Sequence, residues 1–188
     1  MMTIKTGKIS ALCFVTLLAA CASEVRVAAP QTAPETRIAS RYSSLEVTEV
    51  TLPSYAAAED IYFRAADGAI SPTGTLWADL PSRSITLQLA RDLGAITGVT
   101  VAPDPWPFRA FPAAKVDVRI EELLATAEGT FRLSGQFFIA PEADGRATAG
   151  AFAIEEPIVG KPTEAAAIAA ARGRAVSKLA ETIAQGGL

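Results

Sequence analysis

The sequence predicts an α+β fold, in which a mainly antiparallel sheet carries two amphipathic helices on one face. Apolar residues recur at helical spacing in two stretches, 81–97 and 163–186. Apolar and polar residues alternate in three other stretches, 115–124, 130–140 and 147–155, which is the pattern of half-buried strands. Turn residues separate these strands, so hairpin connections are expected. A lipoprotein signal and a flexible tether are expected to precede this domain.

The first 20 residues have the organisation of a secretory signal peptide. Lys5 and Lys8 form a basic start, and an apolar stretch follows over residues 9–20. That stretch is shorter than the ~18 residues that a transmembrane helix needs. It ends in Leu-Ala-Ala-Cys at positions 18–21, which matches the bacterial lipobox. A plain signal peptide with a chance cysteine is the alternative.

The lipobox predicts cleavage between Ala20 and Cys21, with diacylglyceryl and acyl groups on Cys21 and no other cofactor. Two or more acyl chains give stable anchoring, so we expect a protein that is tethered to a membrane without spanning it. Ala22 and Ser23 follow the cysteine, and the absence of aspartate there favours the periplasmic face of the outer membrane over the inner membrane. Cys13 leaves with the signal, so no disulfide is expected.

Residues 21–40 are predicted to be the lipidated cysteine and a disordered linker. They are rich in Ala, Pro, Thr and charge and show no apolar period. Nineteen linker residues reach about 60 Å when fully extended, so the folded domain, residues 41–188, is expected to sit off the membrane surface. A structured arm is the alternative.

The first half of the domain is predicted to contain short strands. Residues 44–52 are apolar at alternate positions with one change of parity, which indicates a bulge. Residues 61–64 and 75–77 form two further short strands. Residues 71–74, Ser-Pro-Thr-Gly, are predicted to be a loop.

Each of the two helices carries start or stop signals. Pro81 suits the first helical position, and Gly98 stops the first helix. A strand over 99–102 and an irregular Pro-rich stretch over 103–107 are expected next. Thr163 is predicted to cap the closing helix, which two glycines end.

The composition excludes several classes of function. The 188 residues suit one domain, and 17 basic against 20 acidic side chains give a net charge of -3. Nucleic-acid binding is not expected, because a basic patch supplies most of its affinity. There is no histidine, which removes Ser-His and Cys-His mechanisms and the commonest zinc ligand, so no metal site is expected.

Few residues are candidates for chemistry. Carboxylates are adjacent at 59–60, 121–122 and 155–156, but neighbouring strand residues point to opposite faces, so these pairs are poorly placed for a glycosidase. A hydrolase that uses carboxylates would need two of them in one apolar cleft. Trp106 and Phe108, on the Pro-rich loop, are candidates for a partner or lipid contact. Aromatic residues that fill the core are the alternative.

The order of these features resembles the PqiC family of ABC-type transport auxiliary lipoproteins. Leu52, Pro53 and Tyr55 match a Leu-Pro-x-Tyr-like element of that family. Trp77 and Asp79 match its Trp-Ala-acidic element, which opens the first helix. The resemblance covers nearly the whole mature chain.

This resemblance implies a protein that is not an enzyme. It would be an accessory subunit of an MCE-type, ABC-linked system for intermembrane lipid transport. Its partners would be an MCE-domain protein and an ABC-type permease, and it would dock their periplasmic assembly at the outer membrane. The transported lipid and homo-oligomerisation are left open. The alternative is a structural lipoprotein of another envelope assembly or secretion complex.

Overall fold

The computed structural model describes residues 24–188, so the predicted signal peptide, Ala20 and Cys21 lie outside the described residues. The described chain forms eight strands, two α-helices and one 3-10 turn. In chain order they are β1 (Arg26–Val27), β2 (Ser44–Val47), η1 (Ser54–Ala56), β3 (Asp60–Arg64), β4 (Ile70–Trp77), α1 (Pro81–Thr97), β5 (Thr100–Pro103), β6 (Ala114–Thr126), β7 (Thr130–Pro141), β8 (Thr148–Pro157) and α2 (Ala165–Gly187).

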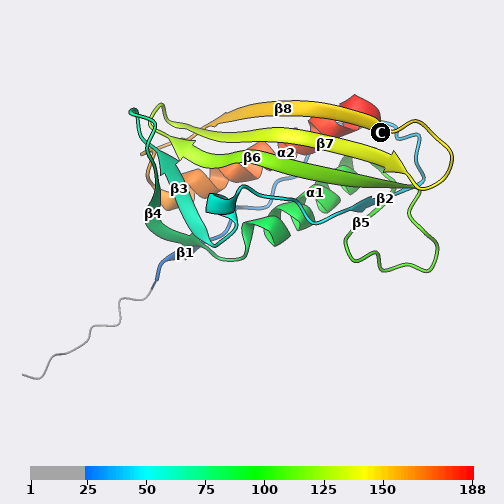
Figure 1. The fold of residues 1–188 in the computed structure, drawn as a ribbon, viewed down its shortest axis with the longest axis horizontal. Helices are drawn as coiled ribbons and strands as arrows, with labels where there is room; N and C mark the ends of the chain where they lie inside the picture. Colours follow the sequence, from blue (N-terminus) through cyan, green and yellow to red (C-terminus); the bar gives the residue numbers. More distant parts are fainter. Residues whose placement is uncertain (1–23) are drawn as a thin grey trace, which may run out of the picture.

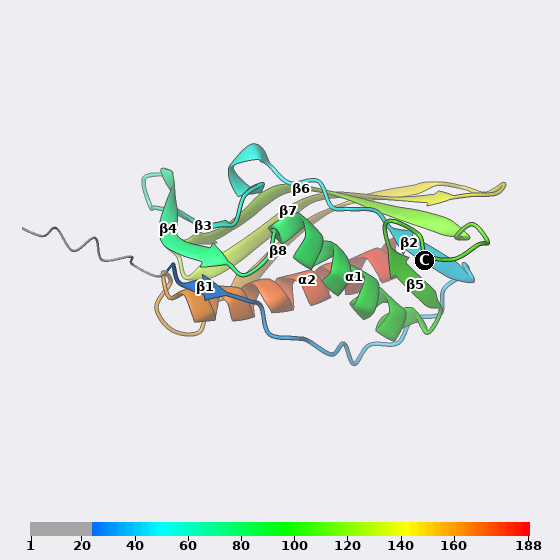
Figure 2. The same ribbon diagram turned by 90° about the horizontal axis from the view of Figure 1, so that it is seen from below.

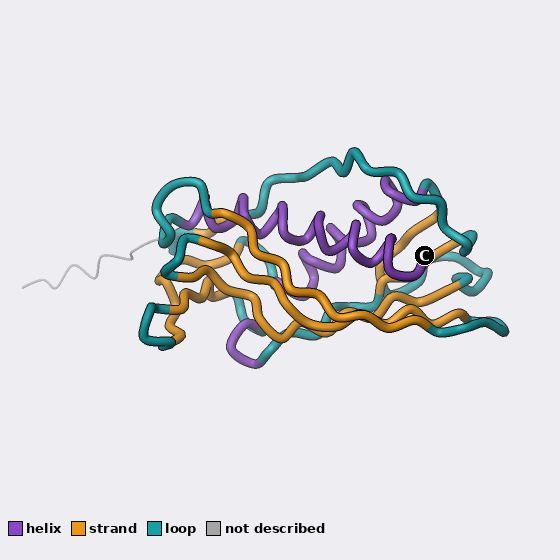
Figure 3. The backbone as a smooth tube through the Cα atoms, turned by 90° about the horizontal axis from the view of Figure 1, so that it is seen from above, coloured by secondary structure: helices purple, strands orange, loops and turns teal. Residues whose placement is uncertain are grey.

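The predicted α+β architecture of one sheet with two helices on one face is confirmed. Figures 1 and 2 show α1 and α2 side by side under the sheet, and Figure 3 shows η1 on the opposite face. The helices cover strands whose inward side chains are buried, among them Val116, Val118 and Leu133. The core therefore lies between the sheet and the helix pair.

The sheet is mixed rather than mainly antiparallel. The two predicted hairpins, β6–β7 and β7–β8, are antiparallel, and so is the β3–β4 pair, which was not predicted as a hairpin. The pairs β1–β4, β2–β5, β2–β6 and β3–β6 are parallel. Sequence alternation reveals which residues face the core but not which strands pair, so the parallel contacts between distant segments were not predictable from it.

The predicted loop over residues 71–74 is wrong, because these residues belong to β4. A turn in which the Gly68 N–H donates to the Ala65 carbonyl at 2.9 Å closes the β3–β4 hairpin. Pro72 pairs with Tyr62 there, away from the Leu76–Trp77 end of β4 where β1 adds. At this edge position the missing N–H of proline costs no ladder hydrogen bond.

Both helices bury the predicted apolar faces. In α1, Ile85, Leu89 and Leu93 are fully buried, and in α2 the same holds for Val176 and Leu179. The helix ends are partly as predicted. Pro81 opens α1, and Gly98 ends it in the left-handed conformation, with φ of 71° and a hydrogen bond to the Gly94 carbonyl.

Thr163 does not cap α2, which is a correction to the sequence prediction. The cap position is Glu164, and its side chain makes no capping hydrogen bond. The Glu164 N–H instead donates to the Lys161 carbonyl at 2.9 Å. That turn contains Thr163, so the helix begins after it.

Residues 24–40 were expected to belong to a disordered linker, and the structure gives them a defined path instead. We call this segment the strap. It begins at β1, beside β4, and then runs across the outer side of α1 and α2 to β2 (Figure 2). The Ile38 N–H donates to the Ile96 carbonyl at 3.0 Å. Hydrogen bonds from backbone and hydroxyl groups hold the strap on the domain. The amino-acid composition of the segment does not reveal these hydrogen bonds.

Candidate functional site

Two of the family-like motif positions, Trp77 and Asp79, lie where β1, α1 and α2 meet. β4 ends at Trp77, and the Ala78 N–H donates to the Val27 carbonyl at 2.8 Å, which fixes the strap against this turn. Trp77 is buried, with 3% of its surface exposed. Asp79 is half exposed and forms an ion pair with Arg83 in the first turn of α1. The Trp77–Asp79 motif thus connects Trp77, the buried last residue of β4, to the start of α1.

Arg172 of α2 is the unexpected member of this site. Its guanidinium lies over the Trp77 ring, 4.1 Å from the ring centroid, and only 4% of the residue is exposed. Nε and Nη1 form no hydrogen bond with any residue that the structure describes. Burial lowers the pKa of Arg172 to about 10, against a smaller upward effect of Asp79. The side chain therefore carries its positive charge at neutral pH in the interior of the protein.

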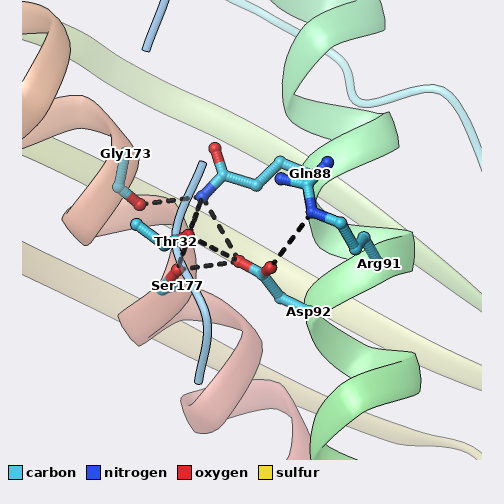
Figure 4. A network of polar contacts seen from close by, with 6 residues as sticks. All are labelled: Thr32, Gln88, Arg91, Asp92, Gly173 and Ser177. Carbon is cyan, nitrogen blue, oxygen red and sulfur yellow. Dashed lines mark hydrogen bonds and ion pairs between the residues drawn. The ribbon is translucent and has the colours of Figure 1, made fainter. Parts of the chain in front are cut away.

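A polar network beside Arg172 fixes the strap to both helices (Figure 4). The buried Gln88 of α1 donates from Nε2 to the Gly173 carbonyl of α2 at 2.8 Å and to Thr32 Oγ1 of the strap at 3.0 Å. The hydroxyl of Ser177 donates to Oδ2 of the fully buried Asp92 at 2.7 Å. Thr32 thus lies at the centre of a network that joins three segments far apart in the sequence.

The strap approaches α2 most closely at Gly173. A Cβ atom at this position would lie 3.1 Å from the Pro30 carbonyl oxygen and 3.7 Å from Cγ2 of Thr32. Glycine therefore allows the strap backbone to lie directly on the helix.

Replacing Thr32 with valine is expected to loosen the strap. The variant keeps the shape of the side chain but loses a hydroxyl with three polar neighbours, so the strap should open more readily by about 1 kcal/mol, or about 5-fold. Arg37, exposed on the strap, is a trypsin site, and limited digestion should cut there about 5-fold faster. Thr163→Val, in an exposed turn, is the matched control and should digest like the parent protein. Equal rates for all three proteins would show that the network does not hold the strap.

The other motif positions, Leu52, Pro53 and Tyr55, lie apart from Trp77. They lead into η1, on the sheet face away from the helices (Figure 3). The Tyr55 hydroxyl accepts a hydrogen bond from the Leu123 N–H at 3.0 Å, and its ring meets the edge of Tyr62. Burial raises the pKa of the Tyr55 hydroxyl. This part of the motif closes the outer face of the sheet.

The predicted contact residues Trp106 and Phe108 lie together on the loop that joins β5 to β6, residues 104–113. Their rings meet edge to face with centroids 4.9 Å apart, and Trp106 Nε1 donates to the Ala110 carbonyl at 2.6 Å. Phe108 is 52% exposed, and Phe111, which the sequence analysis did not single out, is 85% exposed. The three rings place an apolar surface on this loop, which we call the aromatic loop.

Four of the six carboxylates that were considered for catalysis, Glu59, Glu122, Glu155 and Glu156, form ion pairs. Glu122 Oε1 lies 2.6 Å from Arg64 Nη1, and its second oxygen lies 3.3 Å from Arg132 Nε. Burial of Glu122 raises its pKa, but these two arginines outweigh it and the net pKa is lowered. Glu156 pairs with Arg174 at 3.0 Å and also with Lys178. Within residues 24–188, no cluster of acidic or cysteine side chains has the arrangement of a metal site.

The sequence contains a signal for the burial of Arg172. Ile168 and Val176, four residues before and after, are apolar positions of the same helix face, so a charged residue between them had to be buried. Phe111 had a weaker signal, since it shares the Pro-rich loop with Trp106 and Phe108.

The fold and these contacts define a class of protein: a two-layer α+β domain whose N-terminal segment lies across its helices. The chain belongs to the family of ABC-type transport auxiliary lipoprotein components, whose model matches residues 26–184. The PqiC-like resemblance of the sequence is thereby confirmed. The family match begins inside the strap, which agrees with the strap being part of the domain. The chain is therefore a lipoprotein component associated with an ABC-type transport system.

Solved structures share the fold. A crystal structure of an uncharacterized protein is 15% identical, with a TM-score of 0.71, and the match covers 86% of this chain and 97% of the other. The protein XCC0632 from Xanthomonas campestris, of family DUF330, is 16% identical, with a TM-score of 0.62 and coverage of 86% and 90%. No match was found among curated proteins. In the part of the chain that the structure covers, neither helix is long and apolar enough to cross a membrane.

Proposed function

We propose that the protein is a non-catalytic lipoprotein on the periplasmic face of the outer membrane. In this role it is the accessory subunit of an MCE-type, ABC-linked intermembrane lipid transport system. It docks the periplasmic assembly, an MCE-domain protein with its permease, at that membrane. Family membership supports the transport role. The docking role rests on one observation about the placement of two parts of the domain. The end with β1 and the start of α2, which we call the anchored end, and the aromatic loop lie at opposite ends of the domain (Figures 1 and 2).

The anchored end is held close to the membrane in this proposal. The strap is bound to the domain from β1 onward, so only residues 22 and 23 separate the lipidated Cys21 from the described chain. The five residue steps from Cys21 to Arg26, where β1 begins, span at most about 18 Å. The end of the domain with β1 and the start of α2 is therefore held near the membrane surface, instead of ranging over the longer distance expected from a flexible linker.

The aromatic loop then faces away from that membrane. It leads into β6, which has 13 residues and spans on the order of 43 Å toward the anchored end. At that distance the exposed rings of Phe108 and Phe111 are beyond reach of the anchoring membrane. Exposed aromatic residues are typical centres of protein interfaces. This geometry favours a protein contact in the periplasm over a lipid contact.

The non-catalytic role is supported by the state of the carboxylates. The lowered pKa of Glu122 keeps this group ionised at neutral pH, so it is a poor proton donor. Glu156 is held by two cations of α2. Both act as ion-pair partners that join strands or helices.

Site-specific photocrosslinking tests the docking face. A photoreactive amino acid at Phe111 should capture a periplasmic MCE-domain protein in intact cells. The same group at Val159, which is 80% exposed beside the anchored end, is the matched control and should not capture it. Capture of the MCE-domain protein from position 159 alone would contradict the proposed orientation.

A further inference from the structure

A cavity of about 240 Å³ lies between the strap, the Trp77–Asp79 turn and α1. Residues 27–31 of the strap form one wall, and Ser84 and Leu87 of α1 form another. Arg172 reaches the cavity from α2. The volume equals that of about eight water molecules in the liquid, at about 30 Å³ each, so a small organic ion has room in it.

Arg172 gives this cavity an uncompensated positive charge. The residue is 4% exposed, and two of its three guanidinium nitrogens have no hydrogen-bond partner among residues 24–188. Trp77 covers one face of the guanidinium, so hydrogen bonds to a ligand would have to form at its edge, which includes the buried and unpaired Nε and Nη1. A buried cation without hydrogen bonds is strongly unfavourable, so its retention points to a partner that the chain itself does not provide.

The other charged groups at the cavity do not neutralise Arg172. Asp79 is engaged by Arg83, and Arg91 adds a second positive charge at the wall. Arg91 is itself only loosely paired, with its Nε 3.8 Å from the Asp92 carboxylate. The lining therefore carries two cations against one carboxylate, which favours an anion.

We propose that this cavity binds a small oxyanion of the phosphate type, held by the guanidinium edge of Arg172 over Trp77. A guanidinium edge presents parallel N–H donors that match two oxygens of a phosphate. The apolar wall formed by Val27, Pro30 and Leu87 accommodates the carbon atoms of a substituent. The phosphate can be free or belong to a lipid headgroup, and the strap between the cavity and the membrane anchor places both sources within reach. The inference does not depend on the identity of the docking partner.

The test uses the full mature chain in detergent and two probes, inorganic phosphate and glycerol 3-phosphate. Trp77 is one of two tryptophans, so a Trp106→Phe background makes its fluorescence a local reporter of the cavity. Both probes should shift this fluorescence and raise the Tm, compared with sodium chloride at equal ionic strength. Tighter binding of glycerol 3-phosphate than of phosphate would identify a lipid headgroup as the ligand of the cavity. Equal binding of the two probes would identify the free anion as the ligand.

Two variants make the test specific. Arg172→Met should fold with an equal or higher Tm in chloride, since it removes a buried charge, and should bind phosphate at least about 10-fold more weakly. Ser84→Phe fills the cavity and leaves Arg172 in place, and it should also abolish the fluorescence response. The proposal is overturned if neither probe shifts the parent protein, or if the variants respond as strongly as the parent, which would mean an adventitious ion only.

Discussion

A Cys21→Ser substitution is expected to remove the protein from the outer-membrane fraction. In the proposed maturation, the Cys21 thiol would accept the diacylglyceryl group before cleavage, and a serine hydroxyl would not replace it in this reaction. Each buried CH2 of an acyl chain contributes about 0.8 kcal/mol, so losing two or more chains removes nearly all membrane affinity. The variant should be released, or should retain its signal because the lipoprotein peptidase does not process it. Membrane fractionation with a mass measurement of the N-terminus checks this.

Cys13 provides the matched control for this experiment. It lies in the apolar part of the predicted signal, and a Cys13→Ser variant should be processed and anchored like the parent protein. If Cys21→Ser fractionated normally with the outer membrane, the lipobox interpretation and the anchored end of the proposed orientation would both be wrong.

A Phe108→Ser, Phe111→Ser double variant is expected to lower recovery of the periplasmic partner by at least about 10-fold, because removing an aromatic residue at the centre of an interface costs about 2 kcal/mol or more. Both side chains are largely exposed in the isolated domain. Their replacement should therefore leave the Tm nearly unchanged. Co-purification from crosslinked envelopes, scaled to the amount of lipoprotein, measures the loss.

The control for the loop variant is Val159→Ser at the anchored end. It removes an apolar side chain of similar exposure and should leave partner recovery as it is in the parent protein. Unchanged recovery with the double loop variant, at normal stability, would show that the aromatic loop is not the contact.

Local patterns in the sequence predicted the helices and hairpins well. The apolar face of α1 from Ile85 to Ile96 and the turn between β6 and β7 both come from residues close together in the chain. Pairing between distant segments was not predicted, because nothing local specifies that β2 adds to β6. The strand position of Pro72 was not predictable for a related reason, since an edge strand tolerates proline and edge positions are set by the tertiary fold.

The strap shows what a compositional interpretation misses. Its half-buried residues alternate with exposed ones from Thr32 to Ser40, with Glu35 and Arg37 on the exposed side. That period of two is typical of an extended chain lying on a surface. The Ala, Pro and Thr content suggested disorder instead. The candidate site depends on the strap, so the cavity at Arg172 could not be predicted from a sequence pattern that indicated a disordered segment over residues 24–40.

A crosslinked pull-down of the tagged lipoprotein from intact envelopes, identified by mass spectrometry, tests the proposed function most directly. The parent protein should recover an MCE-domain protein together with its ABC-type permease. Recovery of a different envelope assembly or secretion complex, without an MCE subunit, would contradict the proposed role in intermembrane lipid transport.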